Sequence, residues 1–181
     1  PMTDARPNFS AVKPINIKFN ARRGLYFDVK KAMSQSKFKL PAADKRRWEE
    51  LDLVYRTLCG ILYNFGPTTG HPGGSISSGR IVQGLVYRQM AYDIGRPNDT
   101  GNDFIVYAAG HKALGLYAMW ALRDELVRIA RPDLLPAEIN ERLRLEDLLG
   151  FRRNPAQDTP LFREKHARAL DGHPTPATPF V

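Results

Sequence analysis

The chain has a single cysteine, Cys59, among its 181 residues. One cysteine excludes an intramolecular disulfide framework and a zinc site built from several cysteines, and it is typical of a reducing compartment. No stretch approaches the roughly 18 uninterrupted apolar residues that a membrane span needs, and no apolar leader with a small-residue cleavage site opens the chain. We therefore expect a cytoplasmic protein that does not cross a membrane.

The positive charge is concentrated in an N-terminal arm. The chain carries 27 basic and 19 acidic residues, and residues 1–40 hold nine of the basic ones and two of the acidic ones, a net +7 of the total +8. Because these basic residues follow no clear face or motif, we expect the arm to pack on this protein or a partner rather than bind nucleic acid. Its aromatic residues favour burial over a solvated tail: Phe9, Phe19, Tyr26, Phe27 and Phe38.

Residues 41–181 read as one domain of ordinary globular composition. Apolar residues at spacings of three and four predict a helix from about Asp44 to Phe65, and another runs from about Lys112 to Ala130. Ser75, Ser77 or Ser78 is expected to cap a helix between these two.

The fold class follows from one apolar run. Phe104–Ala108 predicts a short buried strand, which leads through Gly110-His111 into the helix from Lys112. One strand cannot make a sheet. We therefore expect an incomplete α/β layer structure whose other strands lie elsewhere. A further helix is expected between Pro136 and Gly150, with Ile139, Leu143 and Leu148-Leu149 buried.

Three of the four histidines follow a glycine: His71, His111 and His173. Glycine lets the backbone turn sharply or approach a ligand, so these histidines are candidates for contact with a polar ligand, although each could simply belong to a turn. Metal-binding histidine spacings, phosphate-binding glycine loops and the nucleophile elbow are all absent. Cys59 lies mid-helix and is a poor candidate for a nucleophile.

Four segments resemble transketolase motifs and occur in that family's order. The resemblance covers about residues 44–181. The matching segments are Thr69-Gly70-His71-Pro72-Gly73-Gly74-Ser75-Ile76-Ser77, Asn102–His111 with Leu116-Tyr117-Ala118, Leu145-Glu146-Asp147-Leu148-Leu149-Gly150-Phe151-Arg152, and Gly172-His173-Pro174 with Thr178-Pro179-Phe180-Val181.

The resemblance implies an enzyme that uses thiamine diphosphate and Mg²⁺ to move a two-carbon ketol unit from a ketose or sugar phosphate to an aldose. It implies the N-terminal part of a three-layer cofactor-binding domain. It places Gly110 and His111 beside the cofactor diphosphate, where an imidazole N–H can donate to a phosphate oxygen. It places His71 and His173 beside the donor substrate as catalytic residues that bond hydroxyls and assist proton transfer.

Several departures from the family limit this interpretation. No Gly-Asp-Gly occurs, so the metal ligands are expected outside this chain. Lys112 replaces a small residue, and the chain before His173 is longer than usual. We expect a split subunit, processed product or proteolytic fragment that is inactive alone, joins a continuing C-terminal polypeptide and forms a homo-oligomer with it. The alternatives are a deoxyxylulose-phosphate synthase or pyruvate dehydrogenase type of enzyme, and a non-catalytic interaction module.

Overall fold

The computed structural model describes residues 28–36, 39–66, 70–152 and 159–174. Most of the predicted basic arm, residues 1–27, lies outside this part of the chain. The chain divides into two units, residues 1–47 and 48–181. The first contains α1 (Val29–Gln35), whose N-cap residue Asp28 accepts a hydrogen bond of 3.0 Å from the backbone N–H of Lys31.

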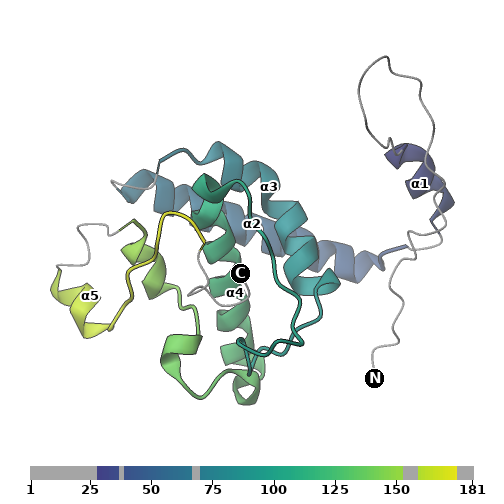
Figure 1. Ribbon diagram of the computed structural model, residues 1–181. Coiled ribbons are helices and arrows are strands. Elements are labelled where there is room, and N and C mark those ends of the chain that lie inside the picture. The colour runs from purple at the N-terminus through teal and green to yellow at the C-terminus, as the bar shows by residue number, and fades with distance from the viewer. Residues whose placement is uncertain (1–27, 37–38, 67–69, 153–158, 175–181) are drawn as a thin grey trace, which may run out of the picture. The chain divides into compact units, whose positions relative to one another are not determined.

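Helices form the second unit (Figure 1). Helix α2 (Ala42–Phe65) begins in the first unit and continues into the second, followed by α3 (Gly73–Gly84) and α4 (Ala113–Ala130). The π-helix η2 (Leu85–Gln89) extends α3. The remaining elements are short, namely the 3₁₀ turns η3 (Gly110–Lys112), η4 (Pro132–Leu134), η5 (Ile139–Glu141) and η6 (Glu146–Gly150), and the helix α5 (Pro160–Glu164).

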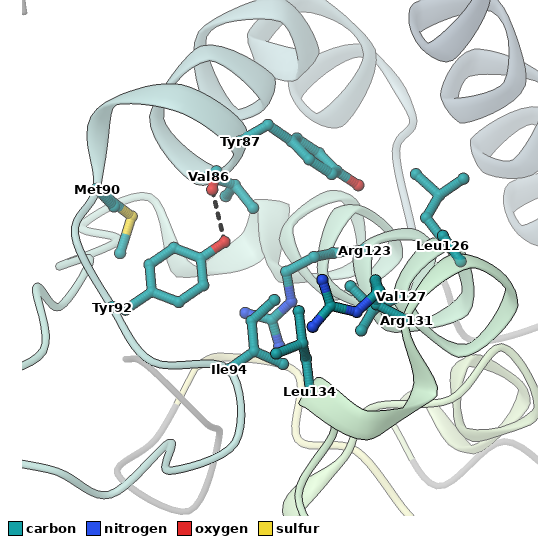
Figure 2. A pocket seen from close by; sticks show the side chains of 11 residues that line it. Val86, Tyr87, Met90, Tyr92, Ile94, Arg123, Leu126, Val127, Arg131 and Leu134 are labelled. Carbon is teal, nitrogen blue, oxygen red and sulfur yellow. Dashed lines mark hydrogen bonds between the residues drawn. The ribbon is translucent and has the colours of Figure 1, made fainter. Parts of the chain in front are cut away.

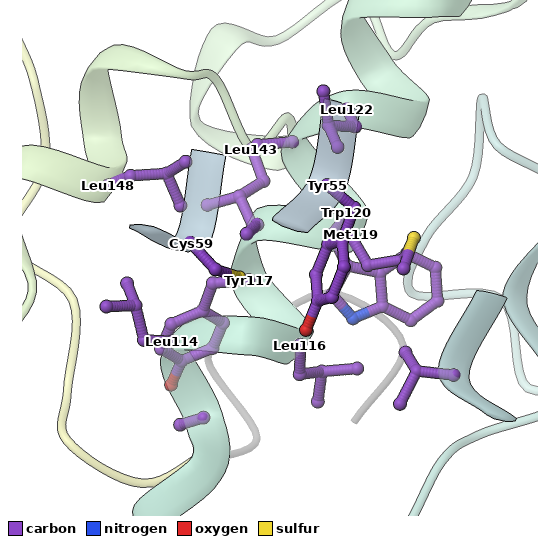
Figure 3. Close-up of a cluster of buried hydrophobic side chains, with 14 of the residues drawn as sticks. Tyr55, Cys59, Leu114, Leu116, Tyr117, Met119, Trp120, Leu122, Leu143 and Leu148 are labelled. Atoms are coloured by element: carbon purple, nitrogen blue, oxygen red, sulfur yellow. The ribbon is translucent and has the colours of Figure 1, made fainter. Parts of the chain in front are cut away.

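The core is organised around α4. Its residues from Ala113 to Asp124 are all buried. The segment Ala113–Leu122 is apolar on every side, which is typical of a buried helix, and Arg123 and Asp124 pair with each other at 2.6 Å. Figure 3 shows side chains of α4 near Tyr55 and Cys59 of α2, Leu143 of the connection between η5 and η6, and Leu148 of η6.

Small residues let the three long helices approach closely. A Cβ built on Gly79 of α3 or on Gly115 of α4 would collide with the Tyr55 ring or hydroxyl. The Tyr55 hydroxyl donates a 2.8 Å hydrogen bond to the backbone carbonyl of Ser75. Tyr55 therefore joins α2 to α3 at a position where glycine is required on both neighbouring helices.

The predicted α/β class is wrong, because the part of the chain that the structure describes is helical and contains no strand. The expected strand at Phe104–Ala108 is irregular: Ile105 is buried, but Val106 is 91% exposed and Phe104 is 50% exposed. A strand needs a neighbour to pair its backbone groups, and this segment has none in the described residues. The single bridge described there is the parallel pairing of Phe151 with Leu170.

The long helices were predicted well and the caps were not. The structure confirms helices at the two predicted ranges, but α3 begins at Gly73, with Pro72 at its N-cap. Ser75, Ser77 and Ser78 therefore lie inside the helix instead of capping it. Between Pro136 and Gly150 the structure has two 3₁₀ turns in place of the expected helix.

The expected burial in this last region is only half right. Leu143 and Leu148 are buried, whereas Ile139 and Leu149 face solvent. Across the described residues, none of the helices combines the length and hydrophobicity that a bilayer crossing requires.

Candidate functional site

The three glycine–histidine pairs lie in short connections next to helices. His71 precedes α3, His111 lies in the 3₁₀ turn η3 that leads into α4, and His173 follows α5. All three histidines are exposed. The strand-to-helix junction predicted for His111 is therefore a turn-to-helix junction, because no strand precedes it in the described residues.

His173 packs directly on Gly110. A Cβ built on Gly110 would lie 2.9 Å from Cγ of the His173 ring and closer still to Cδ2, so any larger residue at Gly110 would displace the ring. The hydroxyl of Tyr117, in α4, donates a 3.1 Å hydrogen bond to the backbone carbonyl of His173. The second and fourth motifs, separated by about 60 residues in sequence, are therefore in contact.

Arg152 connects the first and fourth motifs. Its Nη1 would lie 3.1 Å from a Cβ built on Gly70, and its Nε would lie 3.0 Å from a Cβ built on Gly172. Each of these glycines directly precedes a histidine, His71 or His173. The guanidinium therefore lies between the two Gly-His-Pro turns.

Lys112 and Ser75 connect the first and second motifs. The aliphatic part of the Lys112 side chain packs over Gly74, where an added Cβ would lie 2.8 Å from the Lys112 Cγ. The hydroxyl of Ser75 donates a 3.3 Å hydrogen bond to the Lys112 carbonyl and lies 2.6 Å from the Tyr63 hydroxyl. Burial raises the pKa of Tyr63, and the Ser75 hydrogen bond and the Arg152 charge offset part of this rise, so Tyr63 stays protonated at neutral pH.

We call this region the histidine end, defined by the residues that join the motifs. Sequence reasoning identified the three histidines, Gly110 and Lys112 but assigned no role to Arg152 or Tyr63. Tyr63 lies four and eight residues after the buried Cys59 and Tyr55, so helical spacing could have placed it on the same face of α2. Nothing in the sequence showed that Arg152 lies between two turns. The members of the histidine end are Tyr63, Gly70, His71, Gly74, Ser75, Gly110, His111, Lys112, Arg152, Gly172 and His173.

The histidine end offers hydrogen-bond donors suited to an anion. Imidazole, ammonium and guanidinium groups are the side chains that bind phosphate oxygens. In the described residues, no group of three or more histidine, cysteine, aspartate or glutamate side chains lies close enough to hold a metal ion. The donors present are of the kinds that bind phosphate oxygens, while the described residues supply no cluster of ligands for Mg²⁺.

A second candidate site lies near the other end of α3 and α4 (Figure 2). It is a pocket of about 480 Å³ between η2, the following loop, the second half of α4 and η4. We call this region the pocket end. Its lining is mostly apolar and comprises Val86, Tyr87, Met90, Tyr92, Ile94, Arg123, Leu126, Val127, Ala130, Arg131 and Leu134.

The polar groups of the pocket end bond to the protein itself. Tyr92 donates 2.6 Å to the Val86 carbonyl. Arg123 pairs with the Asp124 carboxylate at 2.6 Å, and its guanidinium stacks 4.5 Å from the centre of the Trp120 ring. Burial raises the pKa of the Tyr87 hydroxyl, which donates 3.1 Å to the Met119 carbonyl. These groups are engaged in holding the fold, so the pocket offers an apolar surface rather than reactive chemistry.

Cys59 is a core residue. Its side chain is fully buried, and burial raises the pKa of the thiol to about 11. A thiol must ionise to act as a nucleophile, so the structure agrees with the expectation that Cys59 has no catalytic role.

Comparison with known proteins finds no relative of this chain. The chain matches no protein-family model, no curated protein and no solved structure. The transketolase resemblance therefore stays a prediction from the motifs, and function has to be argued from the residues themselves.

Proposed function

We propose that this chain contributes to a thiamine-diphosphate-dependent transferase of the transketolase type. The reaction would move a two-carbon ketol unit from a ketose to an aldose. The supporting observation is that the motif residues of the resemblance meet in space: His173 packs on Gly110, and Arg152 lies between Gly70 and Gly172. The proposal rests on this convergence and not on the predicted sheet.

Each histidine has a distinct role in the proposal. His111, with Gly110, holds the diphosphate by donating from its imidazole to a phosphate oxygen. His71 and His173 bind hydroxyls of the donor sugar and move protons, because an imidazole has one nitrogen that can donate a proton and one that can accept it. When bound, thiamine diphosphate would supply the electron sink for the two-carbon unit.

The proposal includes a partner polypeptide and a homo-oligomer of the resulting assembly. Large apolar side chains are exposed on the second unit: Leu53 is 66% exposed, Ile81 67%, Val106 91% and Ile129 67%. Exposed apolar surface of this kind is typical of interfaces. We propose that the partner covers part of it and supplies the ligands for Mg²⁺.

The test is a calorimetric titration of thiamine diphosphate with Mg²⁺ into the assembly. Losing a hydrogen bond to a charged phosphate lowers affinity by roughly 1.5–3 kcal/mol, about ten- to a hundredfold. We expect this loss for His111→Ala and none for the matched variant His166→Ala, because His166 lies in an exposed turn. His71→Ala and His173→Ala should lower kcat more than cofactor affinity.

Substrate assays separate the alternatives. Turnover of xylulose 5-phosphate favours the transketolase type, and turnover of pyruvate favours the related enzymes. Unchanged cofactor affinity in His111→Ala would contradict the assignment of that residue. An assembly that binds no thiamine diphosphate would favour a non-catalytic interaction module.

A further inference from the structure

Arg152 has a backbone conformation that is costly for a residue with a side chain. Its φ is +55°, in the left-handed region, which glycine adopts at little cost and other residues adopt with strain. Two neighbours hold it there: the Phe151 side chain is fully buried, and the Arg152 backbone N–H donates 2.8 Å to the Leu170 carbonyl. Glycine would adopt this conformation at lower cost, so the arginine side chain must contribute something in return.

That contribution lies in what the side chain touches. The stem and Nε of Arg152 lie against Gly172, with Cγ 3.1 Å and Nε 3.0 Å from the place that a Cβ on this glycine would occupy, and Nη1 lies against Gly70. Both contacts exist only because these two residues have no side chain. The planar guanidinium therefore occupies the gap between the turn that carries His71 and the turn that carries His173.

The Arg152 side chain is anchored on its own side as well. Its guanidinium carbon lies 5.3 Å from the centre of the Phe151 ring, which in turn packs edge-on against Tyr117 of α4 at 6.0 Å between ring centres. Tyr117 also bonds the backbone carbonyl of His173. The arginine is thus tied to the buried helix on one side and to both histidine turns on the other.

We propose that Arg152 is a positioning residue that sets the separation of His71 and His173. This inference rests on the proposed function, since those two histidines are its proposed catalytic residues. Arg152 acts through the turns: it fixes where each glycine lies, and each glycine fixes the histidine that follows it. Misplacing a catalytic group by about 1 Å can lower the rate on the order of 100-fold, so the assembly's kcat should depend on Arg152 while its cofactor affinity should not.

The test compares two glycine variants at the two non-glycine residues of positive φ in the described part of the chain, Arg152→Gly and His166→Gly. Glycine suits the backbone at both positions, so the pair separates the loss of the arginine side chain from the relief of strain. The readout on the full chain, without cofactor, is the set of imidazole C–H resonances in NMR spectra. Arg152→Gly should shift those of His71 and His173, and His166→Gly should leave them in place.

Two additions make the test decisive. Millimolar ethylguanidinium, which can occupy the vacated gap, should return the shifted resonances toward their original positions. In the assembly, Arg152→Gly should lower kcat on the order of 100-fold with cofactor affinity unchanged. If Arg152→Gly does not fold, Arg152→Lys replaces it in the test. Lysine keeps a long aliphatic side chain and the positive charge but lacks the planar guanidinium, so this variant should shift the same two resonances.

Unshifted His71 and His173 resonances in a folded Arg152 variant would overturn the inference. Its failure is distinguishable from failure of the proposed function, because the spectra need no cofactor. A chain whose spectra respond as expected but whose assembly binds no thiamine diphosphate would keep the positioning role and reject the proposed reaction.

Discussion

The two ends of the α3–α4 pair are built from the same helices in opposite ways. At the histidine end, side chains cross glycines and present exposed imidazoles. At the pocket end, which begins about 15 Å further along α4, aromatic hydroxyls donate to nearby backbone carbonyls and Arg123 pairs with Asp124. The histidine end keeps its imidazoles exposed to solvent. At the pocket end, the polar groups bond to the backbone and to one another.

The difference shows which end can carry chemistry. Buried polar groups that already have partners are held by them, and separating them is costly. The imidazoles of His71, His111 and His173 are exposed to solvent instead, although the backbone of His173 is held by Tyr117. Replacing an exposed histidine should therefore change function with little effect on stability, whereas disturbing a packed contact at either end should change mainly stability. The following predictions test this distinction, in order of decreasing expected effect.

The largest effect is expected for Asp147→Ala. Asp147 is fully buried and accepts hydrogen bonds from the backbone N–H groups of Arg144 and Arg168, at 2.9 and 2.8 Å, and from the Arg144 guanidinium at 3.1 Å. That guanidinium also donates to the carbonyls of Lys165 and His166. Removing one partner of a buried ion pair lowers the free energy of unfolding by about 3–5 kcal/mol, measurable by urea denaturation.

Hydrogen exchange of the backbone amides shows which end of the molecule Asp147→Ala affects. We expect faster exchange in residues 160–174, which carry His173, and little change around the pocket. Asp133→Ala is the control, because its ion pair with Arg131 is exposed and contributes little. Equal acceleration at both ends would show that the two ends are not independent.

Gly110→Ala should have the next largest effect. The new methyl group would overlap the His173 ring, and such overpacking costs about 1–3 kcal/mol. The control is Gly60→Ala in α2, where a Cβ would have no neighbour within 4 Å, so the better helix propensity should stabilise by about 0.5–1 kcal/mol. Thermal denaturation should move in opposite directions for the two variants, and a stabilised Gly110→Ala would contradict the described packing.

Two tyrosine variants compare a hydroxyl of the pocket end with one that lies next to the histidine end. Tyr92→Phe loses the 2.6 Å hydrogen bond to Val86 at the pocket end, and Tyr107→Phe loses a 3.2 Å contact with the Ser78 hydroxyl beside the histidine end. We expect a loss of about 0.5–1.5 kcal/mol for Tyr92→Phe and less for Tyr107→Phe. Denaturation midpoints that rank the two variants the other way would refute this prediction.

The smallest effect is expected at Asp52, which belongs to neither end. Burial raises the pKa of Asp52, but hydrogen bonds and charge from Arg56 and Arg80 outweigh this and leave it lowered. A carboxyl with a lowered folded-state pKa contributes stability above its unfolded pKa of about 4 and loses it as the pH falls through the folded value.

The corresponding measurement compares urea midpoints at pH 7 and pH 3. Asp52→Asn should lower stability at pH 7 by about 1 kcal/mol or less, because both arginines are partly exposed. At pH 3 the variant should approach the original chain. A difference between the two chains that grows on acidification would have the wrong sign.

The long helices were predictable from the sequence because they satisfy a rule of spacing. In α2, the buried Tyr55, Cys59 and Leu62 recur every three or four residues. Helix α4 contains strong helix formers, and its segment Ala113–Leu122 carries no charged side chain and is apolar on every side. The local pattern determines the helical conformation in both cases, although in α2 the apolar Val54 and Ile61 remain 51% exposed.

The predictions that were wrong concern segments whose structure depends on contacts with residues distant in the sequence. Phe104–Ala108 has the composition of a strand but no partner strand in the described residues, and composition does not supply one. Apolar composition also does not reveal which face of α3 is buried: Ile81 is 67% exposed while Val82 is buried, because the glycine-rich helix turns the face of Gly79 toward Tyr55. The histidine end itself was only partly predictable, since Arg152 reaches it from a motif whose position in space the sequence does not reveal.

The burial of α4 from Ala113 through Asp124 has a consequence for motion. Successive residues of a helix are about 100° apart around its axis. A slip by one residue would therefore turn Asp124 away from the Leu143 backbone N–H that donates to it and Arg123 away from the Tyr92 ring, and it would force apolar side chains into new gaps. The helix can neither roll nor slide without general loosening of the core. Its first turn therefore keeps a fixed orientation relative to the rest of the unit. The short turn η3, which carries His111 and leads into α4 through Lys112, starts from that fixed point.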